Sequence, residues 1–494
     1  MSKILFINPS ATKVMASNPW NSKLTKILKG ENTAFLPKLA GMILAALTPE
    51  EHTFTFVDDE IEDIDYRADA DIVALTAMTE QACRVYQIAG EFRKRGITVV
   101  VGGIHATVMP DEVKLHCDAV MIGEAENMWP ALLEDYENGI LKPVYNAGDY
   151  PPVETLVSPR IGVIKHHRYL SFPIQATRGC PYSCVFCSIK HSSGNRYRMK
   201  PVQQVVNEIL EYEKYNIPGF AGAHRKGYYF VDDNMYVHRE YVKELLTALI
   251  PLNINWDGQG TANIAKDEEI LKLMALSGCR SFGVGFESLM PESIKEANKT
   301  AVNKVDEYKT LVQNIAKNGI ITAGFFVFGF DGDDLSVFQR TRDFIEQSRL
   351  LQPTISVLTP YPGTKLHERI KDRIFNTSCF FYNSWACVFT PKQMSMSELI
   401  QGSLSVGRHT TELGFMRKQL KAFWSYGPWE RNPTLRIDER VALIYLGIKM
   451  GLNGLWEYQR FLFWASVQRK AVDFKTIIWT LRRRELHRSL DMRV

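Results

Sequence analysis

Short apolar runs alternate with helical patterns over the first 140 or so residues. Apolar or alternating runs, which are typical of β-strands, occupy residues 3–8, 53–58, 72–76, 97–101 and 119–122. Residues 37–47 and 80–95 between them repeat apolar positions at helical spacing, and a proline near the start of the first is tolerated there. Strands that alternate with helices predict a parallel sheet covered on both faces. Ligands of such sheets bind at the carboxyl ends of the strands.

A second alternating series follows a proline-rich link over residues 143–170. Six further strands are predicted, at residues 174–176, 227–231, 253–257, 281–286, 320–328 and 354–358. Helical patterns such as residues 202–215 and 268–277 lie between them. Six such units predict a partial (β/α)6 barrel, with its chemistry at the carboxyl ends of the strands. After residue 373 the pattern is helical only, as at residues 397–413 and 439–449.

These patterns predict an α/β protein with four segments. They are a doubly wound parallel-sheet domain (1–142), the link (143–170), the partial barrel (171–373) and a helical C-terminal region (374–494). A length of 494 residues suits two or three domains, and 45% hydrophobic with 23% charged residues is an ordinary globular composition. We find neither a run of 18 apolar residues nor a targeting peptide, so we expect a cytoplasmic protein without a membrane-spanning helix.

The net charge of +4 is unevenly distributed. Residues 411–494 contain 16 Lys and Arg against 8 Asp and Glu, together with five of the nine tryptophans, so this segment carries +8 and the rest of the chain −4. Basic residues with tryptophan fit peripheral contact with an anionic membrane, which would suit a lipid or other hydrophobic substrate. The alternative is a helical cap on the barrel with a solvated basic face. We expect no nucleic-acid partner, because no recognisable binding module accompanies the basic residues.

Three of the eight cysteines stand together after the first barrel strand. The run is Arg178-Gly179-Cys180-Pro181-Tyr182-Ser183-Cys184-Val185-Phe186-Cys187. Three thiolates at this spacing can surround one iron–sulfur cluster, and because such clusters commonly have four cysteine ligands, one iron is left open to bind a small molecule. Zinc sites more often pair two CxxC motifs, and no second CxxC occurs in this chain. Zinc or purely structural cysteines remain the alternative.

The other five cysteines have no spacing typical of ligands. They are Cys83, Cys117, Cys279, Cys379 and Cys387. We expect each to be a buried, inert thiol. A disulfide framework is not indicated, since eight cysteines in 494 residues is ordinary usage. A second site that uses Cys379 and Cys387 is the weaker alternative.

The cysteine run resembles the signature of the radical S-adenosylmethionine (radical SAM) enzymes, including the aromatic Phe186 before the third cysteine. The resemblance implies that Cys180, Cys184 and Cys187 hold a [4Fe–4S] cluster whose open iron chelates SAM. It also implies that an electron, supplied by an external donor, cleaves SAM into methionine and a 5'-deoxyadenosyl radical. That radical removes a hydrogen atom from an unactivated carbon.

Further segments of the barrel are similar to SAM-binding stretches of this family. Phe230-Val231-Asp232-Asp233-Asn234 closes the second strand, where a carboxylate suits the amino group of SAM; an Asx turn is the alternative. Residues 283–288 resemble the segment that faces the ribose. The implied SAM-binding residues are Phe186, Asp232, Asp233, Asn234, Gln259, Glu287 and Ser288. Arg198 and Lys200, after the cysteines, could meet a carboxylate or phosphate, or lie in solvent.

Residues 3–400 as a whole resemble the radical SAM enzymes that have a cobalamin-binding domain, a class with many methyltransferases. Gly102-Gly103-Ile104-His105, Gly123-Glu124-Ala125-Glu126 and the stretch 75–79 carry this similarity. The implied cobalamin-binding residues are Asn8, Pro9, Thr76, Thr79, Gly102, Gly103, His105, Gly123 and Glu124. The Asp-x-His-x-x-Gly motif, whose histidine ligates cobalt in several other cobalamin proteins, is absent. A doubly wound domain whose glycine turns only pack is the alternative.

The resemblance therefore implies an oxygen-sensitive enzyme that uses a [4Fe–4S] cluster, SAM and cobalamin to methylate a carbon of a small molecule, with two SAM molecules per turnover. A radical cyclase or oxidoreductase of a hydrophobic substrate, with or without cobalamin, is the first alternative. A cobalamin-binding or electron-transfer protein without turnover is the second. The sequence indicates neither a particular substrate nor a catalytic residue.

Overall fold

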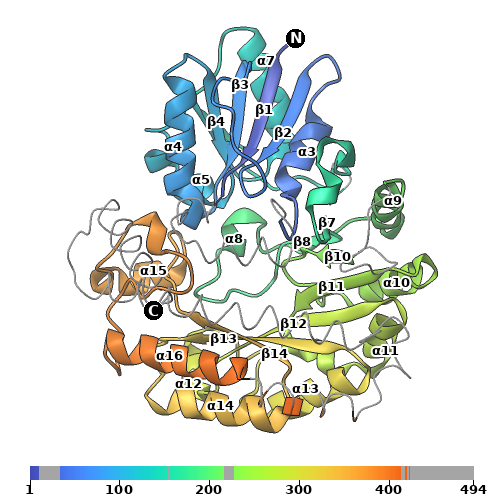
Figure 1. The fold of residues 1–494 in the computed structure, drawn as a ribbon, viewed down its shortest axis with the longest axis vertical. Coiled ribbons are helices and arrows are strands. Elements are labelled where there is room, and N and C mark those ends of the chain that lie inside the picture. The colour runs from blue at the N-terminus through green and yellow to red at the C-terminus, as the bar shows by residue number, and fades with distance from the viewer. Residues whose placement is uncertain are drawn as a thin grey trace, which may run out of the picture.

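The computed structural model describes residues 1–10, 34–153, 156–215 and 227–412, with isolated residues up to Ser425. Two parallel sheets with their helices organise these residues, one above the other in Figure 1. The expected helix at 439–449 and nearly all of the basic segment 411–494 lie outside the described residues. Within the described part of the chain, no helix has the length and apolar character needed to cross a membrane.

The N-terminal sheet has six parallel strands in the order β2-β1-β3-β4-β5-β6. They are β1 (Lys3–Asn8), β2 (Thr53–Asp58), β3 (Ile72–Thr76), β4 (Thr98–Gly102), β5 (Ala119–Ile122) and β6 (Val144–Asn146). Four predicted strands match exactly and β4 is shifted by one residue, whereas β6 comes from the stretch predicted as a link. The order reverses between β1 and β3, the place where doubly wound sheets bind their ligands.

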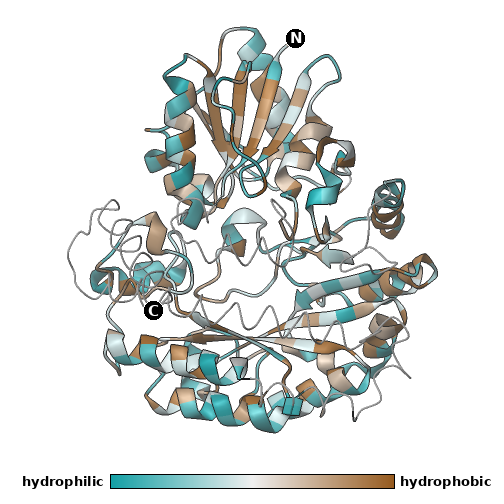
Figure 2. Cartoon of the chain, in the orientation of Figure 1, coloured by the Kyte–Doolittle hydropathy of each residue, from teal (hydrophilic) through white to brown (hydrophobic). Residues whose placement is uncertain are grey.

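Helices cover both faces of this sheet, as the doubly wound prediction requires. Alternate side chains of each strand face opposite sides, so each face needs its own cover. On one face, α3 (Leu39–Leu47) and α7 (Trp129–Glu137) share a core with Ile4 and Phe6. On the other, α4 (Ala82–Arg93), α5 (Ile104–Val108) and α6 (Pro110–Val113) share one with Leu5 and Ile7. Figure 2 shows the apolar strands between these helices.

The second sheet has the order β14-β13-β12-β11-β10-β7, with every pair parallel. Its strands are β7 (Phe172–Ile174), β10 (Gly227–Phe230), β11 (Asn255–Gly260), β12 (Cys279–Glu287), β13 (Ile321–Phe328) and β14 (Gln352–Val357). Because β7 and β14 are the two edges, the barrel is open, as predicted. Its helices are α9 (Val202–Glu213), α10 (Arg239–Leu249), α11 (Glu268–Leu276), α12 (Pro291–Glu296), α13 (Tyr308–Lys317), α14 (Ser336–Ser348), α15 (Lys365–Ile370) and α16 (Met396–Thr411).

A short antiparallel hairpin follows β7 in the chain. Its strands are β8 (Thr177–Arg178) and β9 (Arg198–Met199), and Arg178 stands opposite Arg198. The connection between them, residues 179–197, contains all three clustered cysteines and the short helix α8 (Ile189–Ser192), and we call it the cluster loop. Figure 1 shows α8 between the two sheets, so the cluster loop lies where the two sheets meet.

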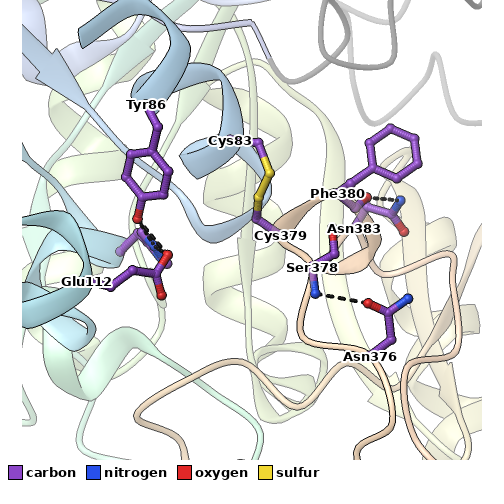
Figure 3. The surroundings of a disulfide bond; sticks show 9 residues. Cys83, Tyr86, Glu112, Asn376, Ser378, Cys379, Phe380 and Asn383 are labelled. Carbon is purple, nitrogen blue, oxygen red and sulfur yellow. Dashed lines mark hydrogen bonds and ion pairs between the residues drawn. A yellow bond between two sulfur atoms is a disulfide. The ribbon is translucent and has the colours of Figure 1, made fainter. Parts of the chain in front are cut away.

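A disulfide joins Cys83, in α4, to Cys379, in the 3-10 turn η11 (Cys379–Phe381), as Figure 3 shows. The expectation of inert thiols at these two positions is therefore wrong, as is a second site built on Cys379. Their sequence separation is 296, and only the packing of the first domain against the segment after β14 brings them together. Cys117, Cys279 and Cys387 are buried and form no disulfide with a described residue, in line with the expectation of buried thiols.

Candidate active site

Cys180, Cys184 and Cys187 are partly buried and free of disulfides on the cluster loop. Burial raises the pKa of all three thiols, that of Cys187 to about 12. The ammonium of Lys299 acts in the opposite direction on Cys180 and Cys184. Without metal the thiols are therefore protonated at neutral pH, and binding iron must release their protons.

The barrel holds the backbone of the cluster loop in place. The Gly179 amide donates to Oδ2 of Asp233 at 2.9 Å, and the Val185 amide donates to the Ala297 carbonyl at 3.2 Å. Gly179 has φ +85°, and a Cβ at this position would lie 2.3 Å from the Arg196 carbonyl oxygen, so the turn before Cys180 requires glycine. The start of the loop is therefore fixed by Asp233, which follows β10, and by Arg196, near the end of the same loop.

The thiols fit a cluster with an open iron. They are three free sulfur ligands on one fixed loop, with Nδ2 of Asn234 4.0 Å from Sγ of Cys180. Among the described residues, no group of three His, Cys, Asp or Glu side chains is arranged to hold a single metal ion.

Glu287 ends β12 in an ion pair that the sequence did not indicate. Its Oε1 accepts from Nζ of Lys299 at 2.7 Å, and both side chains are 8% exposed. Glu287 has φ +64° where the register of β12 shifts against β13. Lys299 lies beyond α12, outside any recognisable motif, so its approach to Glu287 and the thiols follows only from the fold.

Two predicted SAM-binding residues, Asp232 and Ser288, form hydrogen bonds with other residues of the chain. Asp232 is fully buried, and its carboxylate accepts from the Ala176 amide at 3.2 Å and from Oγ1 of Thr177 at 2.5 Å. Ser288 is also fully buried and donates to Oδ1 of Asp333 at 3.0 Å. These bonds tie the ends of neighbouring barrel strands together. The contacts of both residues with SAM stay predictions.

The remaining predicted SAM-binding residues lie around the same strand ends. Gln259 donates to the Asp232 carbonyl at 3.3 Å. Oδ1 of Asn234 accepts from the amides of Tyr236 at 3.2 Å and Thr261 at 3.1 Å, which leaves its Nδ2 toward Cys180. The Phe186 ring packs against Phe330. The fold thus gathers these residues near the cysteines, while their contacts with SAM stay predictions.

A cavity of about 510 Å³ lies between the two sheets. Five of the nine predicted cobalamin-binding residues line it, namely Thr76, Gly102, Gly103, Gly123 and Glu124. The barrel contributes Gln175, Arg178, Ser192, Ser193 and Val231, and apolar side chains including Phe6, Leu39, Ile43, Met121 and Trp129 form much of its wall. Its size lies within the range of about 300–1,000 Å³ that is typical of cofactor and ligand sites.

Gly102 and Gly103 form one edge of this cavity, which we call the glycine edge, and it allows a cofactor to approach the backbone closely. Gly103 has φ +95°, and a Cβ there would lie 2.8 Å from the backbone of Ala77 and from Oγ1 of Thr76. Glycine is therefore needed for the turn itself, and it leaves backbone rather than side chain at the cavity wall. The described lining contains no histidine, which agrees with the missing cobalt-ligating motif.

Asn8, Pro9, Thr79 and His105 lie outside the lining of the cavity. Asn8 donates to Oδ1 of Asp58 at 2.8 Å, and the Pro9 carbonyl accepts from Gln81 at 2.6 Å. His105 is buried beside Tyr86, whose hydroxyl is 3.0 Å from Nε2, and burial lowers the pKa of this imidazole. Their contacts with cobalamin stay predictions.

Arg198 and Lys200 meet carboxylates of the protein itself. Nζ of Lys200 donates to Oε1 of Glu208 at 2.8 Å, with both side chains 2% exposed. Nη1 of Arg198 donates to Oε2 of Glu124 at 2.9 Å. The prediction that each meets a carboxylate is therefore confirmed, and the solvent alternative is wrong for both, because packing brings internal carboxylates to them.

Comparison with known proteins adds two families. The Radical SAM superfamily profile matches residues 174–345, and the B12 binding domain profile matches residues 37–133. The bacteriochlorophyllide d C-12(1)-methyltransferase of Chlorobaculum tepidum is 32% identical over 388 residues, which cover 77% of this chain and 84% of that protein. The anaerobic magnesium-protoporphyrin IX monomethyl ester cyclase of Rubrivivax gelatinosus is 24% identical over 512 residues, covering 96% and 87%.

Among solved structures, the radical S-adenosylmethionine methyltransferase TsrM of Kitasatospora setae has a similar fold. That structure contains cobalamin and a [4Fe–4S] cluster. The TM-score is 0.60 at 18% identity, over 75% of this chain and 78% of that one. At this identity the similarity concerns the fold: the pairing of a doubly wound domain with an open barrel recurs in it.

Proposed function

This chain belongs to the radical SAM superfamily and carries a B12 binding domain, and we propose that it is a cobalamin-dependent methyltransferase of a large, apolar substrate. Its cofactors are a [4Fe–4S] cluster, SAM and cobalamin. The observation that carries the proposal is the cavity between the two sheets. Its wall joins the glycine edge of the first domain to Arg178, Ser192 and Ser193 at the cluster loop, which supports a reaction that uses both cofactors.

When bound, the cluster and SAM supply a radical that removes hydrogen, and cobalamin supplies a methyl group. Overall, one C–H bond of the substrate becomes C–CH3. Two SAM molecules and two electrons from an external donor are consumed, and methionine, 5'-deoxyadenosine and S-adenosylhomocysteine are released. This balance distinguishes methyl transfer from cyclisation, in which the substrate gains no carbon.

The residues of the chain bind and orient the cofactors, and they exclude water from the site. Cys180, Cys184 and Cys187 would hold the cluster, and Asn234 lies beside the first of them. Gly102 and Gly103 would offer backbone to cobalamin. The apolar wall of the cavity keeps water from the reacting atoms, which protects a radical from side reactions.

An apolar substrate is supported by two exposed side chains beside the cavity. Phe35 is 48% exposed and directly precedes the lining residue Leu36, and Met78 is 43% exposed and accepts from Nζ of Lys38, another lining residue. Relatives are named for bacteriochlorophyllide d and for magnesium-protoporphyrin IX monomethyl ester. A porphyrin-type macrocycle is therefore the first substrate class to test.

The composition of residues 411–494 supports peripheral membrane contact, where such substrates partition. Full-length protein should co-sediment with vesicles of anionic lipid at low salt and be released at high salt. It should not sediment with zwitterionic vesicles. Equal recovery in the supernatant with both kinds of vesicle would contradict the membrane contact and leave the methyl transfer untouched.

The function itself is tested on protein purified without oxygen and reconstituted with iron, sulfide and hydroxocobalamin. We expect about four irons and one cobalt per chain. Incubation with SAM labelled in its methyl group, a reductant and a panel of porphyrin-type macrocycles should then label one product. Loss of hydrogen without label would instead assign a cyclase or oxidoreductase, in line with the similarity to the cyclase. Iron without cobalt would contradict the cobalamin-dependent route.

A further inference from the structure

The two arginines at the base of the cluster loop form an unfavourable pair by themselves. Arg178 immediately precedes the loop, Arg198 immediately follows it, and the two are directly opposite in the β8–β9 hairpin. Like charges at such positions repel each other across an antiparallel pair. Both side chains are nearly buried, with exposed fractions of 10% and 4%, so solvent does little to screen the repulsion. The hairpin therefore needs buried anions.

The first domain supplies these anions. Glu124, directly after β5 and Gly123, is 7% exposed, and its Oε2 accepts from Nη1 of Arg178 at 2.8 Å and from Nη1 of Arg198 at 2.9 Å. Its Oε1 pairs with Nη2 of Arg198. Oε1 of Glu126 lies 2.6 Å from Nη1 of Arg178. Two cations thus meet two anions, and the carboxylate of Glu124 bridges both strands of the hairpin.

Other contacts turn the same arginines into anchors for the loop. Nη2 of Arg198 donates to the Ser193 carbonyl at 3.0 Å, and its Nη1 also donates to the Pro151 carbonyl at 3.1 Å. The Arg198 guanidinium lies over the Tyr150 ring, 5.1 Å from its centre. Because Ser193 belongs to the cluster loop, Glu124 is connected through Arg198 to the residue after α8 as well as to the two ends of the loop.

The position of this ion cluster gives it a function. Glu124, Glu126 and Arg178 line the same cavity as Gly102 and Gly103. The carboxylate of Glu124 therefore lies between the edge where cobalamin would sit and the loop that carries the cysteines. A shift of this contact would move the cysteines relative to the glycine edge.

We propose that Glu124 is a positioning residue, which holds both ends of the cluster loop against the first domain and so sets the separation of the iron–sulfur cluster from cobalamin. The sequence indicated cobalamin itself as its contact. The anchoring of the loop follows from the ion cluster alone, and only its consequence for cobalamin rests on the proposed function.

Hydrogen exchange on the full-length, iron-reconstituted protein tests the anchoring without cobalamin. In Glu124→Gln, amides of residues 179–197 should exchange at least about tenfold faster, because the variant loses the charge-assisted hydrogen bonds with both arginines. Glu124→Asp, which keeps the charge, should restore part of the protection. Glu208→Gln breaks an equally buried ion pair with Lys200 and should leave the loop as in the wild type. Unchanged exchange of the loop in Glu124→Gln would overturn the proposal.

The separation of the iron–sulfur cluster from cobalamin can be tested by a second, spectroscopic experiment. In protein loaded with hydroxocobalamin and then reduced, the spin of cob(II)alamin couples to that of the reduced cluster. The electron paramagnetic resonance spectrum should show one defined coupling in the wild type and in Glu208→Gln, and a weaker, more distributed coupling in Glu124→Gln. An identical coupling in Glu124→Gln would refute the positioning role. If the wild type takes up no cobalamin, the proposed function fails, and hydrogen exchange still decides the anchoring.

Discussion

Replacing Lys299 by methionine removes the cation that Glu287 meets at the end of β12. Nζ lies 2.7 Å from Oε1, both side chains are 8% exposed, and Nζ also donates to the Gly285 carbonyl at 3.2 Å. Methionine preserves most of the side-chain volume. The change therefore leaves the carboxylate of Glu287 buried without its cation, at a residue with left-handed backbone.

The cost of this change follows from the geometry. At an effective dielectric constant of about 20, two unit charges 2.7 Å apart attract by about 6 kcal/mol, and desolvation of both groups offsets part of that. Removing one partner of a buried pair costs about 3–5 kcal/mol. For a domain of about 150–250 residues, such as the barrel, 1 kcal/mol corresponds to about 2–4 °C in melting temperature. We therefore expect the melting temperature of the protein to fall by roughly 10 °C.

Thermal melting of the metal-free protein measures this effect. The double variant Lys299→Met with Glu287→Gln removes both charges and should regain much of the lost melting temperature, because no unpaired charge stays buried. Lys295→Met, at an exposed position of α12, is the matched control and should change little. A double variant that melts no higher than Lys299→Met would refute the reasoning, as would a single variant that melts like the control.

Three further predictions concern the site and its frame. Burial raises the pKa of Asp232 from 3.8 to about 7, so the folded protein keeps a proton that the unfolded chain loses, and stability falls as pH rises through this range, by about 4 kcal/mol in all. Asp232→Asn should flatten the pH dependence of the melting temperature, and equal slopes would contradict the assignment. Gly103→Ala should lower cobalt uptake, whereas Gly90→Ala, in open space on α4, should not; equal uptake would show that the turn tolerates a Cβ. Cys83→Ser should destabilise the protein by about 2–4 kcal/mol, and reductant should lower the melting temperature of the wild type to that of this variant but leave the variant unchanged.

The local pattern of the sequence was sufficient to predict most of the strands and the cysteine motif. Strands β1, β3 and β5 match their predicted bounds because a buried parallel strand needs a continuous apolar run, which is visible in any short window. The cysteine motif is equally local, since three thiols within eight residues of one another must share a loop. The glycine pair at the end of β4 was also visible, because the left-handed backbone of Gly103 is a property of the turn itself. Family resemblance then supplied the cofactors that this pattern could not name.

Contacts between residues that are far apart in the sequence could be identified only from the fold. The neighbours of Glu124 in sequence do not reveal that two arginines from the β8–β9 hairpin will meet its carboxylate. Likewise, Cys83 and Cys379 become a disulfide, and Lys299 reaches Glu287, only once the domains and strand ends are packed. The physical reason is the range of the interactions. Periodicity and turn chemistry act over a few residues, whereas ion pairs and disulfides depend on atoms within a few ångströms of one another, whatever their separation along the chain.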